Sequence, residues 1–261
     1  SNCIKLRSIN LPNTITYIGS SVFSGCESLT EINIPSQVTE IRGYSFSHCV
    51  ALEKVVFEEN SILSTIGVNA FSNCTGLISF ELPNNVKKIE SNAFSKCSNL
   101  TNFIINEQSS LVSIGDRAFE DCCNLKNINL PNSLTQIGKW AFSYCESLTF
   151  VCIPEGITEI YSCTFFACES LSTVNLPTTL KIIGDNAFWG CAITEIDIYN
   201  VETIKDGAFG GTNLKSIILG PNLSLIGNSA FYNCDELKTV YNLSSLEITL
   251  GSTDNGYVAY Y

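Results

Sequence analysis

The chain has 261 residues, of which 45% are hydrophobic and only 15% charged, and its formal net charge is −11. Enough apolar surface is present to build a core, which excludes a disordered chain, and the acidic charge argues against nucleic acid or an anionic membrane surface as a partner, because both require a basic face. No apolar run is long enough to insert into a membrane.

One phrase recurs along nearly the whole chain at intervals of 21 to 25 residues. Each of ten copies holds a phenylalanine five residues after an isoleucine and, with the exception of Thr212, three residues before a cysteine. The phenylalanines are Phe23, Phe46, Phe71, Phe94, Phe119, Phe142, Phe165, Phe188, Phe209 and Phe231. The unit has the form C-x-x-L-x-x-I-x-L-P-x-x-L-x-x-I-G-x-x-A-F-x-x, as residues 26–48 show. Such a short period predicts a solenoid of about ten coils that share one core.

Each copy opens with a predicted strand, L-x-x-I-x-L, whose end alternates apolar and polar residues, as at Leu29, Ile32 and Ile34. Alternation of period two is typical of a half-buried strand. The proline that often follows, such as Pro35, ends the strand because it has no N–H to donate. Stacking the copies predicts a parallel sheet along one side of the solenoid.

The second half of each copy returns the chain to the start of the next coil. Six copies place a glycine after the recurrent isoleucine, as at Gly67, where we expect a turn that needs a positive φ. The Ala-Phe step is predicted to bring a large ring into the core through a short helical or 3₁₀ turn. Two copies are longer, and we place their insertions, at 58–61 and 106–109, on the loop edge after the strand.

The domain organisation follows from the repeat. Residues 1–243 are predicted to form a single solenoid whose N-terminal repeat is truncated at Cys3, and residues 244–261 a C-terminal cap. Ser252, Asp254, Asn255 and Gly256 suggest a hairpin turn in the cap. Because the chain has no methionine and begins without a signal-peptide pattern, we expect a fragment or a processed form whose targeting signal lies elsewhere.

The repeated phrase resembles the BspA-like leucine-rich repeats, over roughly residues 3 to 243. The ending NGYVAYY is also similar to C-terminal segments of that family. The resemblance implies a curved α/β leucine-rich-repeat solenoid, with a concave parallel sheet and short helical or 3₁₀ turns on the convex side. It also implies an extracellular or cell-surface setting and roles in adhesion or host-protein binding, with no catalytic residues to carry over. Because fold does not determine function, the resemblance leaves the ligand open.

Thirteen cysteines allow three interpretations. Cysteines on adjacent coils could form disulfides, or they could bind a metal, although a spacing of about 23 residues does not converge ligands as C-x₂-C does. The third interpretation, which we favour, is a ladder of small, buried, free thiols. Thr212 fits it, because that position then asks only for a small and weakly polar side chain.

Residues that could support catalysis are few. The only histidine, His48, precedes Cys49, but Gly25 and Asn73 take its place in neighbouring copies, so we interpret it as a solvent-side variant and not as half of a nucleophilic pair. Glu195 and Asp197 share a strand face and could imitate a glycosidase pair, yet no other residue supports that chemistry. We therefore predict no enzyme, no metal and no cofactor.

The residues on either side of the central isoleucine of L-x-x-I-x-L face away from the core and line the concave sheet. Most are small and polar, and Phe150 is an aromatic exception. An aromatic anchor ringed by polar groups has the composition of a binding hot spot. The predicted ligand-binding patch consists of Asn127, Asn129, Phe150, Cys152, Thr173, Asn175, Glu195 and Asp197. The alternative is that these are simply outward strand residues that stabilise the sheet.

These observations favour a non-catalytic cell-surface or secreted interaction module that binds a protein ligand, such as a host extracellular-matrix protein, through the concave face. Two alternatives stay open. The same face could bind a glycan, although a sugar platform usually needs more rings than Phe150 and Tyr241. The chain could also be a structural spacer within a larger surface protein, which predicts a bland concave face.

Overall fold

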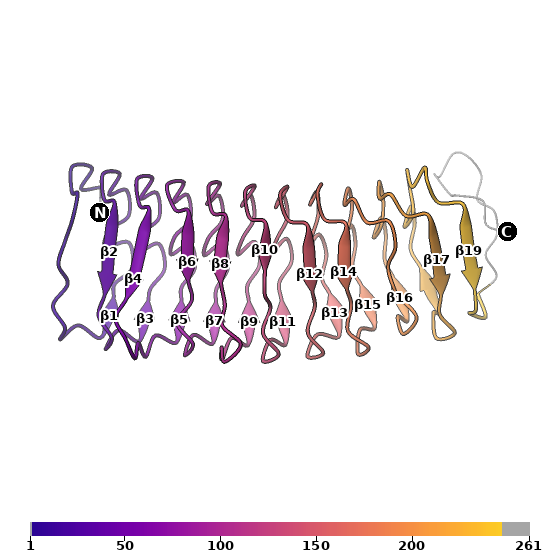
Figure 1. The fold of residues 1–261 in the computed structure, drawn as a ribbon, viewed down its shortest axis with the longest axis horizontal. Coiled ribbons are helices and arrows are strands. Elements are labelled where there is room, and N and C mark those ends of the chain that lie inside the picture. Colours follow the sequence, from indigo (N-terminus) through magenta and orange to yellow (C-terminus); the bar gives the residue numbers. More distant parts are fainter. Residues whose placement is uncertain (1, 247–261) are drawn as a thin grey trace.

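The protein is a single stack of coils, described here in a computed structural model for residues 2–246. Figure 1 shows the coils side by side in one row, with two strands in most coils. We call the side formed by the first strand of each coil the front face and the opposite side the back face. The predicted C-terminal hairpin lies outside the described residues.

The front face consists of parallel strands from the L-x-x-I-x-L segments, as predicted. They are β2 (Glu31–Ile34), β4 (Lys54–Phe57), β6 (Ser79–Glu81), β8 (Asn102–Ile104), β10 (Asn127–Ile128), β12 (Phe150–Cys152), β14 (Thr173–Asn175), β17 (Ser216–Leu219) and β19 (Thr239–Asn242). Their register repeats the sequence phrase, since Ile32 lies opposite Val55 and Val151 opposite Val174. The central residue of each strand is buried and its neighbours are mostly exposed, because successive side chains point to opposite faces.

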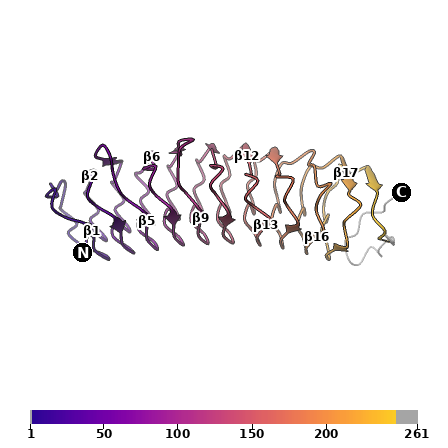
Figure 2. The ribbon, with the colours of Figure 1, turned by 90° about the horizontal axis from the view of Figure 1, so that it is seen from below.

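The back face carries a second set of parallel strands, which the sequence analysis did not anticipate. These strands of two residues end at the recurrent isoleucine. They are β1 (Tyr17–Ile18), β3 (Glu40–Ile41), β5 (Thr65–Ile66), β7 (Lys88–Ile89), β9 (Ser113–Ile114), β11 (Gln136–Ile137), β13 (Glu159–Ile160), β15 (Ile182–Ile183), β16 (Thr203–Ile204) and β18 (Leu225–Ile226). Figure 2, turned from the first view, shows the two sets on opposite sides of the stack. Such short segments are too brief to show a period-two pattern.

The recurrent phenylalanines stack through the core between these faces. Rings in successive coils lie 5.1–5.7 Å apart between centroids. Phe80 and Phe103 add edge-on contacts, for example 4.8 Å from Phe80 to Phe94. The predicted return of each ring to the core is therefore confirmed.

The turns that carry the phenylalanines are not helical, and the predicted α/β class and its helical or 3₁₀ turns are wrong. Residues 2–246 contain no helical segment. In each coil the residues two before and two after the phenylalanine, such as Tyr44 and His48, have a positive φ near 60°. Every second N–H group donates to a carbonyl of the next coil. Phe46, for example, donates to the carbonyl of Ala70 in the next coil, whereas Ser47 donates to that of Tyr44 in its own coil. A helix requires right-handed φ and local bonds from every N–H, so this pattern excludes one.

Five of the six glycines after the recurrent isoleucine serve close packing, Gly19 being the exception, and the predicted positive φ at these positions is also wrong. None of the six lies among the residues with positive φ in the described chain. Instead, a Cβ at Gly115 would come within 2.6 Å of the backbone nitrogen of Ser91, and one at Gly184 within 2.7 Å of the carbonyl oxygen of Ile160. Glycine is favoured here because the backbones of adjacent coils touch.

Candidate functional site

The front face runs along the whole stack, but the hydrogen bonding between its strands is interrupted at two places. β2 and β4 pair with each other, β6 to β14 form a second sheet, and β17 and β19 a third. At the first interruption Phe57 occupies a position that holds leucine or isoleucine in most coils, and its ring packs edge-on against Phe80 at 5.6 Å. At the second, residues 193–198 form no strand, in the shortest repeat of the chain.

Six residues of the predicted patch lie together, five of them on the adjacent strands β10, β12 and β14 and Asn129 just after β10. Phe150 is 39% exposed and lies between Asn127 on β10 and Thr173 on β14, and Cys152 lies opposite Asn175. Asn129 follows β10 directly, and all six side chains are exposed. The strand register therefore brings this part of the patch together, and its role in binding stays a prediction.

The two acidic members, Glu195 and Asp197, are exposed but stand in the segment without a strand. The Oδ1 atom of Asp197 accepts a hydrogen bond of 2.9 Å from the backbone N–H of Tyr199. Such a local bond competes with strand pairing. Within residues 2–246 no strand register aligns these two carboxylates with Thr173 or Asn175.

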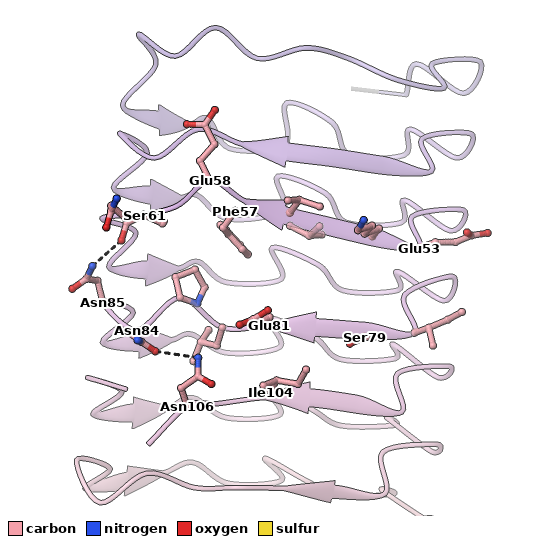
Figure 3. Close-up of a pocket in the computed structure, with 17 residues that line it drawn as sticks. Glu53, Phe57, Glu58, Ser61, Ser79, Glu81, Asn84, Asn85, Ile104 and Asn106 are labelled. Atoms are coloured by element: carbon pink, nitrogen blue, oxygen red, sulfur yellow. Dashed lines mark hydrogen bonds between the residues drawn. The ribbon is translucent and has the colours of Figure 1, made fainter. Parts of the chain in front are cut away.

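A hollow that sequence analysis missed lies over β4, β6 and β8, at the first interruption. Its volume is about 890 Å³. Its lining includes the apolar residues Val56, Phe57, Ile78 and Ile104, of which Ile78 is 53% and Ile104 43% exposed. Figure 3 shows Phe57 and Ile104 on opposite sides of the hollow, with Glu81 between them. A concave, partly apolar surface with a few polar groups is the usual form of a binding site.

Polar side chains border the hollow and are tied to neighbouring coils. Asn85 donates to the carbonyl of Ser61 at 2.7 Å, and Asn106 to the side-chain oxygen of Asn84 at 3.4 Å (Figure 3). The lining carries three carboxylates, those of Glu53, Glu58 and Glu81, and one positive charge, that of Lys54. The lining of the hollow is thus a mixture of apolar and acidic side chains.

A smaller hollow of about 190 Å³ links this site to the predicted patch. It is lined by Ser79 and Ile104, which also line the larger hollow, and by Asn127 and Asn129 of the patch. The sequence held a signal for this region, because Val56 and Ile104 are apolar at outward strand positions. Only the tertiary structure places them over one hollow.

The cysteine ladder is a structural element. All thirteen cysteines are free thiols, as the favoured interpretation predicts. In eight coils the ladder thiol donates to the carbonyl oxygen of the phenylalanine in the preceding coil, with Sγ to O distances of 3.1–3.3 Å. Thr212 instead donates to Phe209 in its own coil and lies 3.2 Å from the Sγ atom of Cys234.

His48 does not form a nucleophilic pair with Cys49. Its Nδ1 atom lies 2.9 Å from the hydroxyl of Ser47, and its side chain is exposed. The thiol of Cys49 is buried, donates to Phe23, and has its pKa raised to about 12 by burial. A thiolate is the reactive form of cysteine, so this thiol is poorly suited to nucleophilic attack.

The thiols are expected to fall into two classes of reactivity. Cys3 and Cys152 are exposed and Cys123 is partly buried, whereas the other ten, thirteen minus three, are buried. We expect a maleimide at neutral pH to label Cys3 and Cys152 within minutes, Cys123 more slowly, and the buried ten only after unfolding. Mass spectrometry of digested protein measures this, and labelling of a ladder peptide as fast as that of Cys152 would contradict the buried ladder.

Over residues 2–246 no three or more His, Cys, Asp or Glu side chains are grouped as ligands for a metal ion. That segment also holds no helix with the length and apolarity to cross a membrane.

Comparison with known proteins is consistent with this architecture. A family model described as BspA type leucine rich repeat region matches six copies over residues 1–110, 105–201 and 141–252. No curated protein matches the chain.

Three solved structures are similar. A leucine-rich repeat protein from Bacteroides ovatus is 32% identical, with 92% of this chain and 73% of that chain covered and a TM-score of 0.68. A T. pallidum leucine rich repeat protein is 33% identical, with 62% and 76% covered and a TM-score of 0.58. The pneumococcal vaccine antigen PcpA, 23% identical with 82% and 62% covered and a TM-score of 0.54, shares the fold.

Proposed function

Because this chain belongs to the BspA-type leucine-rich-repeat family, we propose that it is a non-catalytic interaction module that binds a protein through its front face, at the cell surface or after secretion. Leucine-rich-repeat proteins are general scaffolds for protein interaction. The setting and the adhesive role rest on the family resemblance.

The observation that carries the proposal is the hollow over β4, β6 and β8. Its volume of about 890 Å³ suits one or two protruding side chains of a partner. Ile78 and Ile104 are large apolar residues left open to solvent there, and burying them would favour association. The smaller hollow extends the same surface toward Phe150, so one partner could reach both anchors.

The charge of the lining indicates the chemistry of that partner. Glu53, Glu58 and Glu81 outnumber Lys54 among the apolar side chains of the lining. A complementary surface presents an apolar side chain next to lysine or arginine, and opposite charges across an interface mainly speed association. Raising the ionic strength should therefore lower the association rate.

The test is binding of the chain to a panel of purified extracellular-matrix proteins, with Ile104→Asn and Phe150→Ala variants beside the unchanged chain. Asparagine already occupies the position of Ile104 in other coils, at Asn129 and Asn175, so the fold should tolerate it. Ile218→Asn on β17 is the matched control, because Ile218 is 48% exposed at the same strand position and distant in sequence from the hollow.

We expect Ile104→Asn to weaken binding by about 2 kcal/mol, roughly thirtyfold in Kd, because it removes an apolar anchor. Ile218→Asn should bind as the unchanged chain does. A loss with Phe150→Ala would extend the site along the face. If no matrix protein binds, or if Ile104→Asn binds as tightly as the control, the front-face proposal fails and the spacer hypothesis gains support.

A further inference from the structure

A second surface with binding chemistry lies away from the front face, on the turns that carry the core phenylalanines. We call these turns, from Trp140 to Asn233, the turn edge. Both tryptophans of the chain, Trp140 and Trp189, lie on it. The front-face proposal uses neither of them.

The first aromatic cluster of the turn edge joins two coils. Phe166 packs against Trp140 at 5.5 Å and against Tyr144 at 5.6 Å between ring centroids. The guanidinium of Arg117 covers the ring of Trp140 at 5.3 Å and is itself held by Glu120 at 2.8 Å. Tyr144 stays 38% exposed. The rings of this cluster are therefore held in place by their neighbours, while the ring of Tyr144 is open to solvent.

The second cluster spans three coils. Trp189 leans over Gly210, where a Cβ would overlap its ring, and stacks on Tyr232 at 5.9 Å and an interplanar angle of 18°. Tyr232 is 38% exposed. In the described chain, Phe166 and Trp189 make no ring contact with each other, although they hold the same position in successive coils. The residues beside this step, Ala167 and Gly190, are small, and Phe166 and Trp189 are themselves partly buried.

Two of these aromatic residues have an unfavourable backbone conformation. Trp140 and Tyr144 both have φ of 59°, a left-handed conformation that bulky residues rarely adopt. Other coils fill the same positions with asparagine, such as Asn69 and Asn73, which tolerates this conformation well. The left-handed φ recurs at these two positions in every coil, so the fold imposes the backbone conformation but does not require aromatic rings there.

The composition of the turn edge narrows the class of ligand. From Trp140 to Asn233, the positions two before, one after and two after each core phenylalanine hold only aromatic residues, Ser, Asn, Gly, Ala and Cys. None is charged and none is Val, Leu or Ile, whereas earlier coils place Lys96, Arg117 and Asp121 at these positions. Rigid rings among small polar groups are typical of recognition surfaces. The exposed carboxylates of Glu146 and Glu169 border this uncharged strip.

We propose that the turn edge binds an extended polysaccharide. The C–H face of a sugar ring packs on an aromatic ring, and its hydroxyls donate to carboxylates and amides such as those of Glu146, Glu169 and Asn186. The rings of Tyr144 and Tyr232, each 38% exposed, are the ones open to such a contact. An uncharged strip without aliphatic residues suits a sugar better than an apolar or basic protein segment.

The test uses the two tryptophans as both target and reporter. Unchanged chain, Trp140→Asn and Trp189→Ser are run by native electrophoresis in gels containing xylan, barley β-glucan, galactomannan, pullulan or mucin. Each substitution introduces a residue that other coils carry at that position, Asn69 or Ser143, so the fold should persist, and circular dichroism checks this. Ile104→Asn on the front face is the control. Tryptophan fluorescence is titrated with any polysaccharide that retards the chain.

We expect retardation by at least one polysaccharide, a shift of the tryptophan emission on binding, and at least a fivefold loss of affinity in each tryptophan variant, with Ile104→Asn unchanged. No retardation by any of the five, or equal retardation of folded tryptophan variants, would overturn the proposal. Loss of matrix-protein binding in the tryptophan variants without glycan binding would make the turn edge a protein interface and also overturn it. The front-face proposal stands or falls separately, on Ile104→Asn.

Discussion

Replacing Phe94 by alanine is expected to lower the free energy of unfolding by about 3–5 kcal/mol, the range for a large buried aromatic residue. Phe94 is fully buried and touches four other rings: Phe71 at 5.3 Å, Phe80 at 4.8 Å, Phe103 at 5.0 Å and Phe119 at 5.4 Å. Removing its ring leaves a cavity at the densest part of the core. Each coil contacts only its neighbours, so the coils on the two sides of Phe94 cannot replace the lost contacts by packing against each other.

Urea denaturation followed by circular dichroism and by fluorescence measures this effect. Both tryptophans lie after residue 139, so fluorescence reports the C-terminal coils and circular dichroism the whole chain. If the cavity uncouples the two halves, the two transitions will separate. Phe23→Ala is the control, because within residues 2–246 Phe23 stacks on one ring only, Phe46 at 5.3 Å, and its loss should lower the free energy of unfolding less. Equal losses in both variants would argue against a continuous ring stack.

Raising the pH above 9 is expected to destabilise the protein steeply. Burial raises the pKa of Cys49 and of Cys97 to about 12, from an ordinary value of 9.0, and also raises the pKa of Cys74 and Cys122 well above that ordinary value. Below pH 9 these thiols are protonated in both states and add no pH dependence. Between pH 9 and 12 the unfolded chain releases their protons and the folded chain does not, so stability falls as pH rises.

At pH 10 each thiol with a folded pKa of about 12 should lower the free energy of unfolding by roughly 1–2 kcal/mol, so Cys49 and Cys97 together lower it by about 3 kcal/mol. Urea titrations from pH 7 to 11 measure the loss. Cys97→Thr is the matched variant, because threonine stands in the ladder at Thr212 and does not titrate. Its stability should fall less steeply above pH 9. The same pH profile in both proteins would show that the ladder thiols are not the source.

The two candidate surfaces use different parts of the same scaffold. The front face varies the residues that flank the buried centre of each strand, such as Ile104 and Phe150. The turn edge varies the left-handed positions around each core phenylalanine, such as Trp140. Because both sets point out of the core, substitutions there can change recognition with little effect on stacking. One solenoid can therefore hold two independent binding sites.

The sequence alone determined the stack, its core and its front strands. Phenylalanine and isoleucine recur at the same position of all ten copies, and cysteine in nine of them. Their burial follows from stacking copies of the same short unit, which the sequence shows directly. The free thiols followed from the same reasoning, since Thr212 showed that a bridge was unnecessary. For this reason five of the eight residues in the predicted patch lie on adjacent strands, and Asn129 follows directly after one.

Only the tertiary structure decided the form of the turns and the location of the sites. Every second N–H around Phe46 bonds to the next coil, so the choice between a helix and left-handed turns depends on a neighbour more than 20 residues away. That Glu195 and Asp197 stand outside any strand, in the shortest coil and beside a local bond to Tyr199, was likewise not visible in the sequence. The front hollow and the aromatic clusters join side chains from different coils, which come together only when the register of the stack is set.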